Sequence, residues 1–127
     1  MVSAHERALL RERDVKVCHC PFSNCGKGVP ETPALLEDGI CVGLGTDGAA
    51  HGGLSLWNEM KIFRSVMNVK HGVAQSNPAI MLAAQIISMA TKEGYRLMKE
   101  EGGVIAEGKK SRLYYHQYHA VSFISYW

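Results

Sequence analysis

The sequence predicts an α/β protein with a parallel sheet, and three observations lead to this fold class. Residues 40–44 form an uncharged apolar run that ends in Gly45-Thr46-Asp47-Gly48, as a strand buried on both faces does. Residues 15–20 form a second candidate strand, which Pro21 ends. Helical segments precede both runs, and an alternation of helices and strands requires parallel strands joined by crossovers.

The flanking elements follow from caps and periodicity. Ser3 and Glu6 have capping-box spacing, so a helix is expected up to Arg13. Residues 22–29 are rich in Ser, Asn, Gly and Lys and are expected to form a loop. A short helix is predicted over 34–38, where Gly39 is a good C-terminal stop.

The second half of the chain is predicted to be mainly helical. After a glycine-rich loop at 48–53, a long amphipathic helix is expected with a buried stripe of Leu56, Met60, Phe63 and Met67, flanked by Trp57 and Val66. A loop over 71–77 leads to another helix, which opens at Pro78 and runs with a break towards Glu100. Only two strands are expected from these patterns. A two-stranded sheet cannot bury both faces of its strands, so the sequence indicates a piece of a larger fold.

Composition excludes several classes of function. The 127 residues are 46% hydrophobic and 20% charged, as in a soluble globular domain, and the net charge is only +2. No basic or acidic block suggests nucleic acid or a membrane surface as a partner, and no apolar stretch approaches the roughly 18 residues of a membrane span. We therefore expect neither partner, and we expect a cytoplasmic protein, since the sequence shows no secretory leader.

The four cysteines, at positions 18, 20, 25 and 41, do not have zinc-finger spacing. Reduced thiols are therefore the expected state, with Cys18 and Cys20 on one side of the strand and His19 on the other. A small metal-binding protein that uses these cysteines is a hypothesis with little support from their spacing.

Asp47 is the first candidate functional residue. Parallel α/β sheets and barrels place their chemistry at the carboxyl ends of strands, where an aspartate can bind a metal or act as a base. An aspartate in a short Asp-Gly turn can instead cap the next turn through its side chain. The residues alone leave both interpretations open.

An ordered set of motifs adds to this interpretation. It comprises His19-Cys20-Pro21-Phe22-Ser23-Asn24, Gly28, Pro33, Leu35-Leu36, Gly39-Ile40, Gly43-Leu44-Gly45-Thr46-Asp47-Gly48, Glu59-Met60, Met89-Ala90-Thr91 and Glu107-Gly108-Lys109-Lys110. The set resembles the metal-dependent amidohydrolases, in particular the branch of cytosine, guanine and adenosine-type deaminases and chlorohydrolases. The resemblance covers roughly residues 3–112.

The resemblance implies a partial (β/α)8 TIM barrel. Residues 1–110 would be the C-terminal part of the barrel, with 15–20 as its seventh strand and 40–44 as its eighth, and residues 111–127 a divergent tail. Asp47 then matches the aspartate that binds the catalytic metal and takes a proton from its water. The implied cofactor is a divalent cation, zinc by preference and iron as an alternative, held only together with N-terminal ligands that this sequence lacks.

The resemblance also implies a substrate pocket. His19 and Asn24 match positions at the mouth of the seventh strand, and His51-Gly52 stands where many relatives have Ser-Asn, so His19, Asn24 and His51 are candidate substrate-binding residues. For His19 the alternative is a histidine satisfied in the core, and for His51 an exposed loop residue. Ser23 and Asn24 are also expected to shape the loop through side-chain to backbone hydrogen bonds.

Two hypotheses for function follow. The first is a fragment of a hydrolase that deaminates or dechlorinates a nucleobase-like heterocycle, inactive alone because one carboxylate cannot hold a catalytic metal. Its partners would be a small heterocyclic substrate and either further copies of the chain or the missing part of the barrel. The alternative is a non-catalytic remnant that acts as an association module through exposed strand edges and apolar helix faces.

Overall fold

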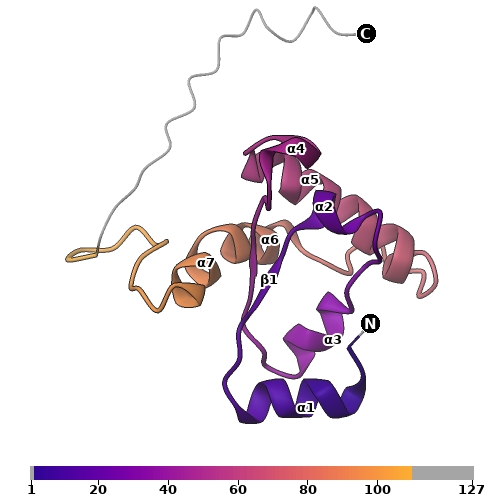
Figure 1. The fold of residues 1–127 in the computed structure, drawn as a ribbon, viewed down its shortest axis with the longest axis horizontal. Helices are drawn as coiled ribbons and strands as arrows, with labels where there is room; N and C mark the ends of the chain where they lie inside the picture. The colour runs from indigo at the N-terminus through magenta and orange to yellow at the C-terminus, as the bar shows by residue number, and fades with distance from the viewer. Residues whose placement is uncertain (1, 110–127) are drawn as a thin grey trace, which may run out of the picture.

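The structure is a computed structural model that describes residues 2–109, and two parallel strands lie at its centre (Figure 1). Strand β1 (Val17–His19) pairs with β2 (Val42–Leu44), with Val17 opposite Val42 and His19 opposite Leu44. The predicted parallel pairing is confirmed. Both strands are shorter than the runs 15–20 and 40–44, because only residues 17–19 and 42–44 pair with each other.

The helices that precede the strands lie together near the amino ends of β1 and β2 (Figure 1). Helix α1 (Ala4–Glu12) has the predicted capping box between Ser3 and Glu6, and α3 (Thr32–Glu37) leads into β2. The Arg7 guanidinium contacts Asp38 at 2.6 Å, so an ion pair joins the two helices at this end of the sheet.

The segments that follow the strands are short helices, although the sequence predicted loops there. Helix α2 (Pro21–Asn24) begins directly after β1, and α4 (Ala49–Gly52) follows β2. The predicted loops at 22–29 and 48–53 are therefore wrong in part. Each helix has only four residues, about one turn, which is too short to show hydrophobic periodicity.

The long helix α5 (Leu56–Met67) has its predicted extent, but its buried face differs from the prediction. Phe63 and Met67 are fully buried, whereas Leu56 and Trp57 are 37% and 54% exposed. The carboxylate of Glu59 is buried instead, because its Oε2 accepts a hydrogen bond from the backbone N–H of Phe22 at 2.9 Å. At Glu59, helix α5 faces a polar backbone group of α2. The buried face of α5 is therefore not a continuous apolar stripe.

The remaining elements are the π-helical turn η1 (Asn68–Gly72), α6 (Ala83–Ala90) and α7 (Lys92–Leu97). The expected loop at 71–77 and the expected helix start at Pro78 are both displaced, since α5 continues into η1 and α6 begins only at Ala83. The predicted break before Glu100 is confirmed, because Thr91 separates α6 from α7. The expected tail, 111–127, lies outside the described residues.

One core joins the strands to the helices. Its buried apolar side chains are Leu35, Ile40, Val42, Leu44, Phe63, Met67, Met81, Ile86 and Met89. Between residues 2 and 109, no helix is both long and apolar enough to cross a bilayer.

His19 extends from β1 into this core. Its ring is 3% exposed, its Nδ1 lies 3.1 Å from the hydroxyl oxygen of Thr32, and it packs edge-on against Phe63 with ring centres 5.3 Å apart. Burial disfavours the charged imidazolium and lowers the pKa of His19 from 6.5 to about 4.

This depressed pKa predicts a loss of stability in acid. Between pH 6.5 and 4 the unfolded chain binds a proton at His19 that the native state does not, so the free energy of unfolding falls as the pH drops. The expected loss is on the order of 3 kcal/mol, with no further contribution below pH 4. Urea unfolding at several pH values should show this loss in the parent chain and a smaller one in His19→Asn, whereas replacing the exposed His5 should leave the loss unchanged. An equal loss in His19→Asn would contradict the assignment.

Glu59 gives a second prediction. Glu59→Ala leaves the N–H of Phe22 without its acceptor, and the free energy of unfolding should fall by about 2 kcal/mol. Glu59→Gln retains an acceptor oxygen and should lose less than half as much. Chemical denaturation of both variants, with the exposed Glu37→Ala as the control, measures the difference.

Candidate functional site

The carboxyl ends of β1 and β2 bring a serine and an aspartate together. Ser23 lies on α2, directly after β1, and Asp47 lies three residues beyond the end of β2. The Ser23 hydroxyl donates a hydrogen bond of 2.6 Å to Oδ2 of Asp47. Hydrogen bonds to an ionised acceptor are shorter and stronger than neutral ones, so this contact orients the carboxylate.

The backbone of Asp47 has an uncommon conformation. Its φ of 56° lies in the left-handed region, which aspartate and asparagine enter more readily than most other residues. Asp47 is not the N-cap residue of α4, because Gly48 has that position and α4 has no side-chain cap. Asp47 is an exposed residue, and its side chain does not cap α4.

Contacts with neighbouring elements hold Ser23 and helix α2 in position. Ser23 is 4% exposed, and α2 is attached to α5 by the bond from the Phe22 N–H to Glu59. Asn24 accepts a hydrogen bond from the Cys20 N–H through its Oδ1 at 3.2 Å. The predicted side-chain to backbone bond is thus confirmed for Asn24, whereas the hydroxyl of Ser23 bonds to a carboxylate 24 residues away. Sequence reasoning missed this contact, although the parallel pairing of the two strands was a signal for it.

The other two candidate residues are placed differently. The ring of His19 lies on the core side of β1, between Thr32 and Phe63, and does not meet Asp47 there. This environment is that of a histidine satisfied in the core. His51 is part of α4, the helix that follows Asp47. Substrate binding by His19, Asn24 and His51 stays a prediction.

Two thiols lie on the opposite side of β1 from His19. A Cβ atom on Gly45 would be 2.8 Å from Sγ of Cys18 and 3.1 Å from Sγ of Cys20, so both sulfurs approach the same backbone position. Cys18 is an exposed residue, but partial withdrawal of its sulfur from water is the main cause that raises the pKa of Cys18 to about 11, followed by Cys20 and then by the charge of Asp47. Cys18 is therefore a protonated thiol at neutral pH, and it lies within electrostatic reach of Asp47.

The site contains one side chain of a type that binds metals. A carboxylate oxygen is a ligand that zinc accepts, and Ser23 orients the Asp47 carboxylate in the way that partners of metal ligands do. Within residues 2–109, no three or more His, Cys, Asp or Glu side chains form a group that could hold a metal ion. Asp47 fits as one ligand of a set whose other members are not among these residues.

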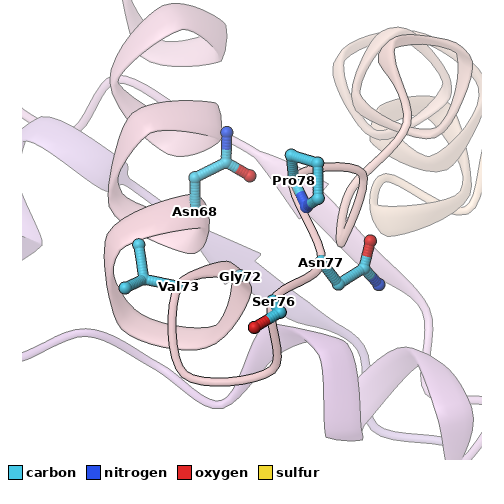
Figure 2. Close-up of a pocket in the computed structure, with 6 residues that line it drawn as sticks. All are labelled: Asn68, Gly72, Val73, Ser76, Asn77 and Pro78. Atoms are coloured by element: carbon cyan, nitrogen blue, oxygen red, sulfur yellow. The ribbon is translucent and has the colours of Figure 1, made fainter.

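A separate surface pocket lies beyond the far end of α5. Figure 2 shows its lining side chains around η1 and the turn that follows, and its volume is about 330 Å³. The lining residues are Asn68, Gly72, Val73, Ser76, Asn77 and Pro78, none of which has a titratable side chain. This pocket therefore offers no acid, base or charged metal ligand.

Comparison with known proteins relates this geometry to a family. The sequence profile of the Amidohydrolase family matches residues 1–114. The chain is 40% identical over 104 residues to a 5′-deoxyadenosine deaminase of Methanothermobacter thermautotrophicus, covering 80% of this chain and 23% of that protein. It is 35% identical over 116 residues to a 5-methylthioadenosine/S-adenosylhomocysteine deaminase of Dictyoglomus thermophilum, covering 88% of this chain and 26% of the relative.

Solved structures give the same result. A guanine deaminase from C. acetobutylicum with bound guanine superimposes with a TM-score of 0.70 and 27% identity, over 79% of this chain and 24% of its own. An adenosine deaminase from Xanthomonas campestris with bound zinc gives a TM-score of 0.69 and 26% identity, over 80% of this chain and 25% of its own.

The chain thus spans about a quarter of the length of the relatives that it matches. The family profile covers most of the sequence, and the fold superimposes on about a quarter of the chain of each of the two deaminase structures. The resemblance that the motifs predicted is confirmed: this chain belongs to the amidohydrolase family.

Proposed function

We propose that this chain is the part of a metal-dependent deaminase that carries the seventh and eighth barrel strands, and that Asp47 is a metal ligand and proton acceptor. The observation that carries the proposal is the 2.6 Å hydrogen bond by which Ser23 orients the Asp47 carboxylate at the carboxyl ends of two parallel strands. Catalytic groups of such barrels are located at this edge. The remaining metal ligands would come from the three quarters of the barrel that these residues do not provide.

The substrate class follows from the relatives. Deaminases of 5′-deoxyadenosine and of 5-methylthioadenosine or S-adenosylhomocysteine match this chain, as does the guanine deaminase structure. We therefore propose a purine-like heterocycle that carries an exocyclic amino group. A chloro-substituted heterocycle would fit the same chemistry, with chloride instead of ammonia as the leaving group.

The mechanism assigns separate tasks to the residues of this chain. A bound divalent cation, zinc by preference, would lower the pKa of a water molecule so that it can attack a ring carbon. Asp47 would be one of the residues that hold this cation, and its carboxylate would accept a proton and return it to the leaving amino group. The Ser23 hydroxyl holds Oδ2 of Asp47 in place while Asn24 maintains the turn after β1.

The three candidate substrate residues lie in different surroundings. Asn24 on α2 and His51 on α4 belong to the elements that follow the two strands, where a substrate pocket would form. His19 is packed between Thr32 and Phe63, and contact with a substrate would require it to leave this environment. We propose that His19 supports β1 from the core side.

The role of Asp47 is tested in a chimera that completes the barrel. Residues 1–109 replace the matched segment of the Methanothermobacter thermautotrophicus 5′-deoxyadenosine deaminase, and 5′-deoxyadenosine deamination and zinc content are measured. Asp47→Asn should lower kcat by roughly 100- to 10,000-fold and reduce bound zinc, because it removes a ligand and a base. Asp14 is the matched control, since it is also an exposed aspartate with a positive φ. The proposal is wrong if Asp47→Asn retains both the activity and the zinc.

Ser23 provides a prediction about orientation. In the same chimera, Ser23→Ala should weaken zinc affinity or kcat by about 10- to 100-fold, as replacing partners of metal ligands does. Ser65→Ala removes a hydroxyl that bonds to the backbone of its own helix, and it should have no effect. Equal effects of the two substitutions would contradict the orienting role.

A non-catalytic association module is the second candidate function, and the exposed apolar side chains after Asp47 favour it. Leu54 is 74% exposed and Trp57 54% exposed, and in the described part of the chain each strand has one unpaired edge. Such surfaces promote association. An inactive chimera, together with a parent chain that self-associates in sedimentation experiments, would favour this function over catalysis.

A further inference from the structure

The thiols of Cys18 and Cys20 are placed together by the strand. Residues two apart project from the same side of an extended chain, and His19 between them projects into the core. The Cys20 thiol is close enough to Cys18 to be one of the causes that raise the pKa of Cys18. They form a pair on a short rigid segment, separate from the bond between Ser23 and Asp47.

The neighbouring strand leaves room for this pair. Gly45 follows β2, and its N–H bonds to the carbonyl oxygen of His19 at 2.9 Å, so the glycine lies directly beside the cysteines. Any side chain at this position would begin 2.8 Å from Sγ of Cys18, closer than real Cβ contacts, and 3.1 Å from Sγ of Cys20, tighter than most of them. The absence of a Cβ atom on Gly45 thus accommodates both sulfurs on one side of the sheet.

The pair is also accessible, unlike the buried cysteine of this chain. Cys18 is exposed and Cys20 half-buried, whereas Cys41 is buried with its Sγ 3.2 Å from a carboxylate oxygen of Glu93. Cys25 is exposed but lies at the end of α2, whereas Cys18 is on β1 and Cys20 directly follows β1. The sequence contains no cysteine beyond these four.

We propose that Cys18 and Cys20 form a dithiol site that binds trivalent arsenicals. The reaction is a condensation with an organoarsenic oxide: two S–As bonds form, and the oxygen leaves arsenic as water with both thiol protons. Arsenic remains trivalent, and no oxidant or reductant is consumed. Two sulfurs on adjacent positions of one face satisfy two of the three bonds of arsenic, and the organic group retains the third.

The chemistry of the thiols suits this ligand better than it suits an alkylating agent. Alkylation requires the thiolate, which the protonated thiol of Cys18 supplies slowly, whereas the condensation consumes the thiol protons as water. Once the first S–As bond has formed, the second thiol of the same chain has a high effective concentration near arsenic. The adduct should therefore resist competition by a monothiol. The site does not depend on the proposed deaminase function.

The test uses phenylarsine oxide and the full 127-residue chain. Intact mass spectrometry should show one phenylarsenic group per chain that persists in excess 2-mercaptoethanol and is removed by 2,3-dimercaptopropanol. Cys18→Ser and Cys20→Ser should each lower the amount retained in the monothiol by at least about tenfold, because a single S–As bond exchanges readily. Cys25→Ser is the matched control and should retain the adduct fully.

Circular dichroism of each variant separates loss of the site from loss of the fold. Retention by Cys18→Ser or Cys20→Ser in a folded chain would overturn the proposal. So would loss of the adduct in a folded Cys25→Ser, which would assign the site to a different pair of cysteines. Removal of the adduct from the parent chain by the monothiol alone would equally overturn it.

Discussion

The parallel pairing of β1 with β2 is the constraint on which the rest of the structure depends. It places the carboxyl ends of two strands, separated by about two dozen residues of chain, at one edge. Ser23 and Asp47 meet only because of this pairing, and the thiols of Cys18 and Cys20 reach Gly45 for the same reason. In an antiparallel pair the segments after the two strands would lie at opposite ends, and neither contact would form.

The packing of helix α5 holds the carboxyl ends of the strands in position. Helix α5 contributes Phe63 against His19 and Glu59 against the N–H of Phe22, so a single helix supports both β1 and the short helix that carries Ser23. A helix of four residues is not stable by itself, and its position depends on such tertiary contacts. The buried histidine and glutamate therefore belong to the support of the site, although neither contacts Asp47 in this structure.

The family relationship explains why the fold looks incomplete. The chain corresponds to about a quarter of each relative, and within residues 2–109 it supplies one candidate metal ligand and a two-stranded sheet. Leu54 and Trp57 remain largely exposed for a globular protein of this size. Both the single candidate ligand and the exposed apolar side chains are consistent with a chain that matches a quarter of the related barrel structures.

The sequence by itself determined the fold class, the parallel pair, the extent of α5, the capping box of α1 and the family, because these depend on local patterns and ordered motifs. It did not predict α2, α4 or η1, which are too short or too irregular to leave a periodic signal. It also assigned Leu56 and Trp57 to the core, where tertiary structure buried Glu59 instead. The sequence singled out Asp47, but only the tertiary structure decided that Ser23 orients it and that His19 turns into the core. Such contacts join residues far apart in the chain, and their geometry is set by strand register and helix packing rather than by the spacing of residues.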